Sequence, residues 1–272
     1  MVIFPNAKIN IGLNITHKRT DGYHDLETVF YPINIKDCLE VVHATENETK
    51  PVLFSTSGIN VDGDPSNNLC YKAYYLLKKD YPQIGPIQLF LHKVIPIGAG
   101  LGGGSSDGAH MLTLLDQVFD LQIKKEQLLL YALELGSDCP FFIYNQACFA
   151  SGKGEKLTPI SLPLSSYKIF IVNPNIHINT GWAFQQLSSF TSQHLKQSIM
   201  QPISEWKKNI FNDFETPVFL AYPEIKKIKD LLYENGAIYA SMSGTGSTVF
   251  GIFENEISIT NTFPKSYFHK WV

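Results

Sequence analysis

The residues of this chain that can most directly do chemistry are the glycines and serines of one short loop. Five glycines precede two adjacent serines, in the order Gly98, Gly100, Gly102, Gly103, Gly104, Ser105 and Ser106. Glycines let successive backbone N–H groups point into one concavity, and a helix that starts behind them adds unpaired amides and the positive end of its dipole. Because that combination binds anions, we interpret the loop as a phosphate-binding cradle.

The segments on either side of the loop are predicted to hold it in place. An apolar run from Ile87 to Ile95 is typical of a strand, and it stops at Pro96. Behind the serines, apolar residues recur at helical spacing from Met111 to Val118. A flexible linker is the alternative, but glycine linkers seldom lie between a strand and a well-patterned helix.

Three sequence motifs compete for the loop. It lacks the Gly-Lys-Ser/Thr of a Walker A loop. Gly98-x-Gly100-x-x-Gly103 matches the dinucleotide fingerprint, but a second helical segment follows it in place of a strand that ends in an acidic residue. Gly104-x-Ser106-x-Gly108 matches the nucleophile elbow, although a run of mostly glycine precedes the serines here. A serine hydrolase built on Ser106 and a non-catalytic nucleotide-binding protein stay open as alternatives.

The composition narrows the class of protein. With 272 residues, 44% of them hydrophobic and 17% charged, the chain can form one large globular domain or two smaller ones. A net charge of −3 and a single arginine, Arg19, give no footprint for nucleic acid. No apolar run approaches transmembrane length, and four cysteines without metal-binding spacing or a signal peptide indicate reduced thiols. We therefore expect a cytoplasmic protein, monomer or homodimer, that binds neither nucleic acid nor membrane.

The first strand carries polar side chains on one of its two faces. From residue 7 to residue 15, small and branched apolar residues alternate with Lys8, Asn10, Gly12 and Asn14. This second face is either solvated, as on most half-buried strands, or functional. The two asparagines favour a function, since Asn is depleted in strands.

The rest of the chain mixes strands with helices. Further strands are predicted at 26–35, 38–43, 51–57, 167–172, 237–242, 248–253 and 267–272. Helices are predicted at 105–119, 124–135 and 224–235, after a cap at Ser66 or Asn67, and after a cap at Thr180. The segment 152–163 is interpreted as a connection between two halves. Antiparallel signals in both halves predict an α+β fold, divided into lobes 1–157 and 158–272.

Three local patterns admit both a structural and a functional interpretation. Tyr23 and His24 lie in a turn. They are either ordinary surface residues or a functional pair that offers a planar ligand a stacking face and a donor/acceptor ring. Asp138, ahead of Pro140, is a helix N-cap or a catalytic carboxylate. The turn 243–247 is a plain hairpin on local grounds.

Taken together, five stretches resemble the GHMP kinase superfamily, which covers small-molecule kinases such as those for galactose, homoserine and mevalonate. The stretches are 5–10, 21–24, 96–106, 135–142 and 243–246, and they follow the family's order and spacing. Each is weak alone, but jointly they are specific. Asp-Gly-Tyr-His with Lys8 favours a member whose substrate carries cytidine diphosphate, with a homoserine or mevalonate-type kinase as the alternative.

The resemblance implies both a fold and an activity. It implies an α+β protein with a ribosomal-S5-like N-terminal lobe that carries ATP and a ferredoxin-like C-terminal lobe. It also implies an ATP- and Mg²⁺-dependent kinase that phosphorylates a hydroxyl group of its cytidine-diphosphate substrate, in the synthesis of isoprenoid precursors.

The same resemblance assigns roles to individual residues. Lys8 and Asp138 become the catalytic pair. The ATP side consists of Lys93, Pro96, Ile97, Gly98, Ala99, Gly100, Leu101, Gly102, Gly103, Gly104, Ser105 and Ser106, with the loop around Asn67 and Asn68. The substrate side consists of Asn10, Tyr23, His24, Thr180, Phe184, Ser243, Gly244, Thr245 and Gly246, with Tyr23 and Phe184 expected to sandwich the cytosine. Ser105 or Ser106 is the expected Mg²⁺ ligand, because Gln127 and Glu134 match the glutamate of other members only loosely.

The chain departs from the family pattern at two positions of the loop. Ala99 stands where close relatives usually have glycine, and the added methyl group leaves the expected cradle intact. Asp107 stands where asparagine is common. An acid in the first turn of a helix suits the helix dipole, but it adds negative charge near bound phosphates.

Overall fold

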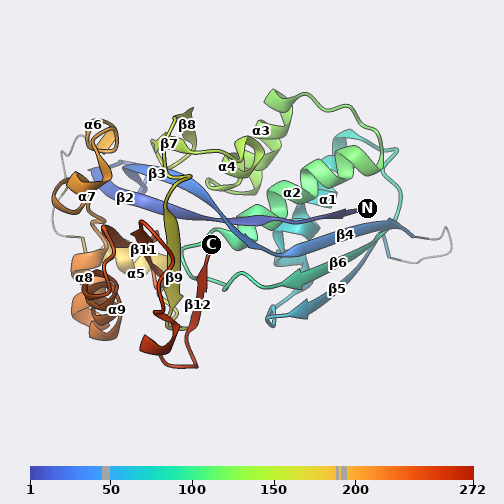
Figure 1. Ribbon diagram of the computed structural model, residues 1–272. Coiled ribbons are helices and arrows are strands. Elements are labelled where there is room, and N and C mark those ends of the chain that lie inside the picture. The colour runs from blue at the N-terminus through green and yellow to red at the C-terminus, as the bar shows by residue number, and fades with distance from the viewer. Residues whose placement is uncertain (45–49, 188–189, 191–194) are drawn as a thin grey trace. The chain divides into compact units, whose positions relative to one another are not determined.

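The computed structural model describes residues 1–44, 50–187, 190 and 195–272. The chain forms two compact units that are interleaved along the sequence, with the elements labelled in Figure 1. The first unit comprises Met1–Ala7, Asn34–Ile97 and Gly102–Asn145, and the second comprises Lys8–Ile33, Gly98–Leu101 and Gln146–Val272. The lobes predicted from the sequence, 1–157 and 158–272, are continuous stretches of the chain, and the boundary between them stays a prediction.

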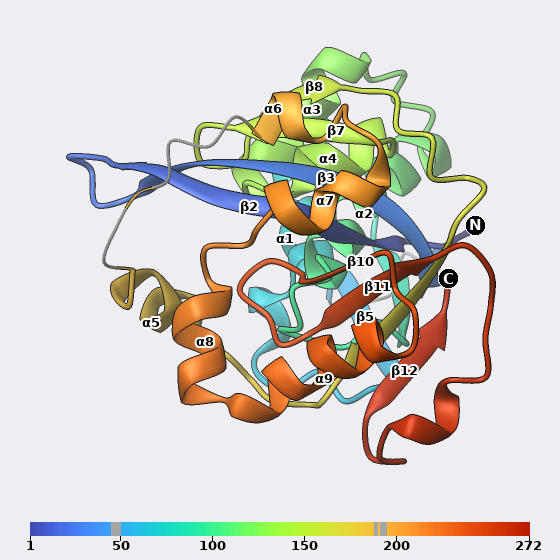
Figure 2. The ribbon, with the colours of Figure 1, turned by 60° about the vertical axis from the view of Figure 1, so that its left-hand side comes forward.

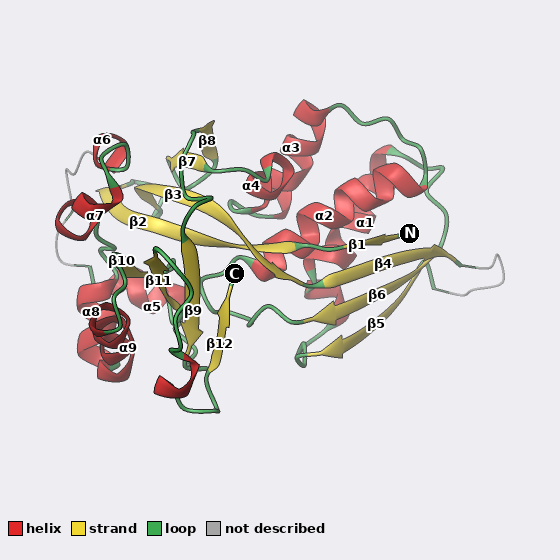
Figure 3. Ribbon diagram, viewed as in Figure 1, coloured by secondary structure: helices red, strands yellow, loops and turns green. Residues whose placement is uncertain are grey.

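The first unit contains a sheet of four strands (Figure 3). Their order is β1 (Val2–Ile3), β4 (Cys38–His43), β6 (Ile87–Lys93) and β5 (Val52–Gly58). Only the pairing of β5 with β6 is parallel. In β6 the buried residues Ile87, Leu89, Leu91 and Lys93 alternate with more exposed ones, so a lysine takes the last buried position of an otherwise apolar face.

The helices of the first unit pack against this sheet and against one another. They are α1 (Leu69–Asp80), α2 (Gly103–Val118), α3 (Lys125–Leu135) and the short α4 (Cys139–Tyr144). A 3₁₀ turn, Pro65–Asn67, precedes α1, so the predicted cap at Ser66 or Asn67 is wrong. The cap is Asn68, whose side chain accepts the N–H of Cys70 at 2.9 Å. Gly108 lets α2 approach α1 closely, since a Cβ there would lie 2.7 Å from Cβ of Leu69.

The second unit contains a sheet built on two long strands. Its order is β2 (Asn6–Lys18), β3 (His24–Lys36), β7 (Cys148–Ser151) and β8 (Lys156–Pro159). Both faces of β2 are buried, and Lys8, Asn10 and Asn14 are no more than 3% exposed. The solvated-face interpretation of this strand is therefore wrong, because other parts of the protein cover the polar side as well. The connection expected from residue 152 is also corrected, since β8 returns there to pair with β7.

A second, fully antiparallel sheet completes the second unit. Its order is β10 (Tyr239–Met242), β11 (Val249–Phe253), β9 (Lys168–Asn173) and β12 (Phe268–Trp271). The predicted strands at 237–242, 248–253 and 267–272 are confirmed with shorter bounds, and the strand predicted at 167–172 is confirmed with a shift of one residue. Helix α9 (Pro223–Glu234) follows α8 (Glu215–Ala221) directly and runs at an angle to it (Figure 2), and α9 packs on β10 and β11. The amphipathic face of α9 places Ile225, Ile228 and Leu232 in the core.

Shorter helices fill the rest of the second unit. They are α5 (Thr180–Gln185), α6 (Leu195–Ser198) and α7 (Ile203–Asn209), with a 3₁₀ turn at Thr260–Thr262. The expected cap of α5 at Thr180 is wrong by one residue. Asn179 caps this helix by accepting the N–H of Trp182 at 2.9 Å, while Thr180 is its first residue.

Candidate active site

The glycine loop connects β6 to α2, as the sequence predicts. Gly98, Gly100 and Gly102 have φ values of 64°, 78° and 69°, the left-handed region that glycine adopts without strain. Gly102 is the N-cap of α2, and it provides no side-chain cap. The first amides of α2 therefore have no capping side chain, and they point out of the helix toward any anion placed there.

The first part of the loop packs against the turn 243–247 within the second unit. Oγ of Ser243 donates to the carbonyl of Gly100 at 2.7 Å, and the N–H of Thr248 donates to the carbonyl of Ala99 at 3.3 Å. A Cβ at residue 100 would lie 2.0 Å from the carbonyl oxygen of Ser243, so only glycine fits there. The turn joins β10 to β11 as a hairpin, as predicted. It also supports the glycine loop, and the plain-hairpin interpretation did not include that second role.

Lys8 and Asn10 lie on β2 and connect to the same turn. Nζ of Lys8 donates to Oδ1 of Asn10 at 2.5 Å and lies 4.8 Å from the ring centroid of Phe30. The backbone N–H of Asn10 donates to Oγ of Ser243 at 3.1 Å. The backbone N–H of Lys8 donates to the carbonyl of Leu101 at 2.9 Å, at the other end of this loop segment. Four stretches of the chain, around residues 8–10, 30, 100–101 and 243, therefore meet at this part of β2.

Asp138 immediately precedes α4. It takes the N-cap position, as the structural interpretation of the sequence predicts, although its side chain makes no capping hydrogen bond. Burial raises the pKa of the neighbouring Cys139 thiol to about 12, which keeps that thiol protonated. Asp138 belongs to the first unit and Lys8 to the second, so their pairing stays a prediction.

Lys93 lies between two carboxylates beneath the loop, in the first unit. Its Nζ donates to Oδ2 of Asp107 at 2.7 Å and to Oδ2 of Asp37. Oδ1 of Asp37 in turn accepts the N–H groups of Val94 and Ile95 at 2.6 and 2.9 Å. The three side chains therefore join the end of β6 to the first turn of α2. The predicted role of Lys93 toward ATP stays a prediction, since the contacts of its ammonium group are with protein carboxylates.

The charges of this cluster influence one another strongly. Burial lowers the pKa of Lys93, but Asp107 and Asp37 outweigh that effect and raise it above its ordinary value. Burial raises the pKa of Asp107 to about 8 against the attraction of Lys93, and the carboxylate of Asp37 adds to the rise. Oδ1 of Asp107 is buried without a hydrogen-bond partner. The acid at position 107 is therefore held in an environment that disfavours its charge.

The two serines of the loop differ in access. Ser106 is fully buried, and its Oγ donates to the carbonyl of Asn6 at 2.7 Å. Nδ1 of His110 lies 3.2 Å from this hydroxyl but 2.9 Å from the carbonyl of Ser106, the geometry of an i, i+4 contact within a helix. A buried hydroxyl that already donates is a poor nucleophile, so the hydrolase alternative loses support. Ser105 is half-buried, which makes it the better candidate for a metal ligand.

No preformed metal site accompanies these serines. Within the described residues, no group of three or more His, Cys, Asp or Glu side chains could hold a metal ion. Gln127 and Glu134 lie on α3 and are exposed.

The predicted substrate residues all belong to the second unit. The rings of His24 and Phe184 stack with centroids 4.8 Å apart and planes inclined by 19°. Tyr23 is 60% exposed, with Nζ of Lys153 lying 4.7 Å from its ring centroid. Oγ1 of Thr180 lies 3.4 Å from Oγ1 of Thr245. The ring that faces Phe184 is thus His24 rather than Tyr23, and the predicted sandwich of cytosine by Tyr23 and Phe184 stays a prediction.

Sequence reasoning missed the residues that support these groups. Asp37 gives no local signal, because nothing near it in sequence identifies its partner Lys93. Asn212 and Glu215 fit an Asn-x-x-Glu pattern that marks a helix start, and α8 does begin at Glu215. Asn67 lies in the 3₁₀ turn and Asn68 caps α1, so the amide oxygen of Asn68 is used by the protein itself.

Comparison with known proteins places this arrangement in context. Residues 68–146 match the family model of the GHMP kinases N terminal domain, and residues 195–263 match that of the GHMP kinases C terminal. A 4-diphosphocytidyl-2-C-methyl-D-erythritol kinase of Bacteroides fragilis is 51% identical over 96% of this chain and 94% of its own. The protein of the same name from Bacteroides thetaiotaomicron is 48% identical over 96% and 95%.

Solved structures give the same result. A crystal structure of 4-(cytidine 5'-diphospho)-2C-methyl-D-erythritol kinase superposes with a TM-score of 0.80 at 30% identity, covering 93% of this chain and 90% of that one. The Methanococcus jannaschii mevalonate kinase shares the fold at a TM-score of 0.72 and 16% identity, covering 93% and 90%. None of the helices in the described part of the chain has the length and apolar character needed to cross a bilayer.

Proposed function

This chain belongs to the 4-diphosphocytidyl-2-C-methyl-D-erythritol kinases of the GHMP kinase family, and we propose that it transfers the terminal phosphoryl group of ATP to the 2-hydroxyl of that substrate. Mg²⁺ is proposed as the accompanying cation. The proposal explains why the five motif stretches, 5–10, 21–24, 96–106, 135–142 and 243–246, occur together in one chain. It also extends to this chain the activity that the names of its relatives state.

The observation that carries the proposal is the convergence around Lys8. The Lys8 ammonium group is held by Asn10, Asn10 is held by Ser243, and Ser243 holds the carbonyl of Gly100. A buried cation that is fixed next to a glycine loop suits the stabilisation of charge during phosphoryl transfer.

Positioning and charge neutralisation dominate phosphoryl transfer, because its transition state is loose. ATP bound with Mg²⁺ would supply the phosphoryl group and cover part of its negative charge. The uncapped amides at the start of α2 and the half-buried Ser105 would hold phosphate oxygens. Asp138 would orient the attacking hydroxyl group or accept its proton, and Lys8 would stabilise the developing charge.

The acceptor itself can be tested with a panel of substrates. ADP release is measured with 4-diphosphocytidyl-2-C-methyl-D-erythritol, homoserine and mevalonate as separate acceptors. We expect turnover with the first only. Turnover with another acceptor would favour a different GHMP kinase, and binding of ATP without turnover on any acceptor would favour a non-catalytic nucleotide-binding protein.

The catalytic role of Asp138 can be tested by Asp138→Asn. We expect kcat to fall by about 10²–10⁴-fold, since proton transfer and orientation of the hydroxyl group are both weakened. Equilibrium binding of ATP serves as the control. An unchanged kcat would remove Asp138 from the mechanism.

The cytidine site can be tested by Phe184→Ala, which removes the ring that stacks on His24. We expect weaker binding of the cytidine-diphosphate substrate, with unchanged binding of ATP. Titration of both ligands against the variant measures this, and equal weakening of both would contradict the assignment. The oligomeric state, monomer or homodimer, and the cytoplasmic location stay predictions.

A further inference from the structure

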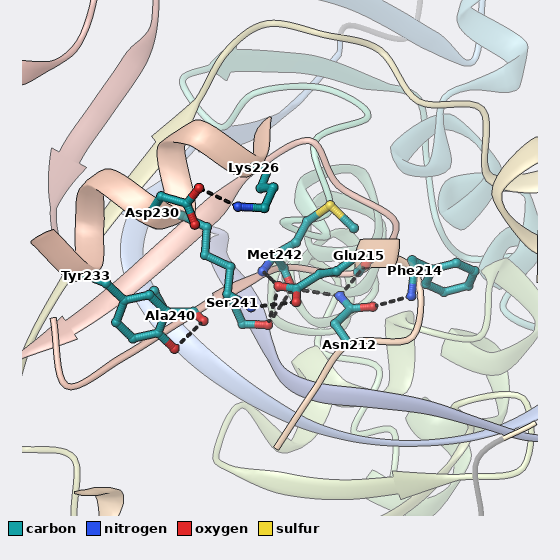
Figure 4. A network of polar contacts seen from close by, with 11 residues as sticks. Asn212, Phe214, Glu215, Lys226, Asp230, Tyr233, Ala240, Ser241 and Met242 are labelled. Atoms are coloured by element: carbon teal, nitrogen blue, oxygen red, sulfur yellow. Dashed lines mark hydrogen bonds and ion pairs between the residues drawn. The ribbon is translucent and has the colours of Figure 1, made fainter. Parts of the chain in front are cut away.

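We propose that Asn212 and Glu215 are positioning residues of this kinase. They do not touch the reacting groups themselves, but they fix the backbone of residues 241–244. That backbone in turn holds the glycine loop and Asn10 in place. The inference rests on the proposed function. Glu215 is the first residue of α8 and Asn212 lies three residues before it, and Figure 4 shows both beside Ser241 and Met242 at the end of β10. Both are buried, with exposed fractions of 3% and 7%.

Glu215 uses both carboxylate oxygens. Oε1 accepts the backbone N–H of Met242 at 2.8 Å and the hydroxyl of Ser241 at 3.1 Å. Oε2 accepts Nζ of Lys229, from α9, at 2.6 Å. A carboxylate that bonds a backbone N–H is a strong, directional acceptor, so the end of β10 is fixed relative to α8 and α9.

Asn212 fixes Met242 and Gly244 through their carbonyl groups. Its Nδ2 donates to the carbonyls of Met242 and Gly244, both at 2.8 Å. Its Oδ1 accepts the N–H of Phe214 at 3.0 Å (Figure 4). Backbone groups on both sides of Ser243 are therefore held by side chains from one short segment.

The same segment also binds β2, the strand that carries Lys8. The N–H of Leu13 donates to the carbonyl of Phe211 at 2.9 Å, and the N–H of Asp213 donates to the carbonyl of Leu13 at 2.8 Å. Oδ2 of Asp213 accepts the N–H of Ile15 at 2.7 Å. Residues 211–215 thus set the spacing between β2 and the turn 243–247.

That spacing controls the groups with proposed catalytic roles. Ser243 donates to Gly100 and accepts the N–H of Asn10, whose amide oxygen holds the Lys8 ammonium group. A shift of residues 241–244 would therefore pass to the loop and to Lys8 together. Misplacement of a reacting group by about 1 Å can cost roughly 10²-fold in rate, even when the altered residue lies far from the chemistry.

The test compares Asn212→Ala, Glu215→Ala and Glu215→Gln. The first removes both donors to the turn and the second removes the acceptor of the Met242 N–H. We expect each to lower kcat by about 10- to 100-fold, with KM for the cytidine-diphosphate substrate changed by less than about 3-fold. Glu215→Gln keeps an acceptor oxygen for Met242, and we expect it to recover most of kcat.

Two control variants separate positioning from loss of stability. Lys229→Met removes the outer partner of Glu215 but leaves the contacts with Ser241 and Met242, so it lowers Tm without changing kcat well below Tm. Lys226→Met breaks an exposed ion pair with Asp230 on the same helix (Figure 4), and it is expected to change neither quantity. If Asn212→Ala and Glu215→Ala keep kcat within twofold of the wild type while Tm falls, the proposal is overturned.

Amide hydrogen exchange tests the inference without a measurement of enzyme turnover. We expect Glu215→Ala to speed amide exchange at Met242 and through the turn 243–247, whereas Lys229→Met leaves these amides protected. If the wild-type protein turns over no acceptor, the proposed function fails, and this exchange result still decides whether Asn212 and Glu215 fix the turn. Unchanged exchange in both alanine variants would overturn the inference. Should Glu215→Ala not fold, Asn212→Ala carries the same test.

Discussion

Two buried charged clusters support glycine-rich turns of this protein, and they balance their charges differently. In the first unit, Lys93 lies between Asp37 and Asp107, and the side chains are 4%, 0% and 4% exposed. In the second unit, Glu215 pairs with Lys229, and these side chains are 10% and 19% exposed. The first cluster joins the two ends of the glycine loop, while the second fixes the turn that follows β10.

The difference lies in how completely each carboxylate is satisfied. Both oxygens of Glu215 have partners, and a backbone N–H and a hydroxyl group share the charge with Lys229. Asp107 instead shares one lysine with a second acid and leaves Oδ1 without a partner. Burial of charge is favourable only where geometry and hydrogen bonds compensate desolvation. The contribution of the first cluster to stability should therefore depend on the protonation of Asp107.

The largest effect is expected from Lys93→Met. This change removes the cation that lies between two buried acids, and we expect a loss of about 3–5 kcal/mol in the free energy of unfolding at pH 7. Urea denaturation followed by circular dichroism measures it. A loss below about 1 kcal/mol would show that the cluster is more hydrated than its burial indicates.

Asp107→Asn should act in the opposite direction, and its effect should depend on pH. Since the pKa of Asp107 is raised from 3.8 to about 8 in the folded protein, the stability that the neutral acid provides is fully present only below about 3.8 and is lost progressively as pH rises to about 8. An asparagine stays neutral at every pH, so the stability of the variant relative to the wild type should rise by about 1–4 kcal/mol between pH 5 and pH 9. Urea denaturation of metal-free protein at pH 5, 7 and 9 checks this, and parallel pH profiles would contradict it.

Lys229→Met should cost less than Lys93→Met. Glu215 keeps the N–H of Met242 and the hydroxyl of Ser241 as partners, so we expect a loss of about 1–3 kcal/mol in the free energy of unfolding. The same urea experiment provides the value. If the loss equals or exceeds that of Lys93→Met, the contrast between the two clusters is wrong.

The smallest effect is expected from Lys226→Met, which breaks a pair whose side chains are 57% and 48% exposed. Solvent screening leaves such a pair with about 0.5 kcal/mol or less. Parallel urea curves for the variant and the wild type would confirm that position and burial, not the presence of an ion pair, decide the cost.

Much of the fold could be predicted from the sequence, because periodicity is a local property. The strand 38–43 is β4 residue for residue, and the predicted helices at 124–135 and 224–235 correspond to α3 and α9 within one residue at each end. The short elements β7, α4 and α8 were not predicted, since four to seven residues are too few for a period to emerge. Caps were misplaced by one or two residues where several polar residues compete for the same helix start.

Only those residues of the candidate site that belong to sequence motifs could be predicted. The sequence by itself determined the family, the glycine loop between a strand and a helix, and the motif residues of the substrate side. Only the tertiary structure decided that Lys93 pairs with two acids, that His24 rather than Tyr23 faces Phe184, and that Asn212 and Glu215 hold the turn beside Gly100.

The physical reason is the range of the interactions concerned. Backbone preferences and hydrophobic period act over a few residues, so a sequence displays them directly. The partners of a buried polar group are chosen by packing, and here they lie 56 residues apart for Lys93 and Asp37 and 233 residues apart for Asn10 and Ser243. A chain must fold before such groups meet, and no local pattern records which of them will.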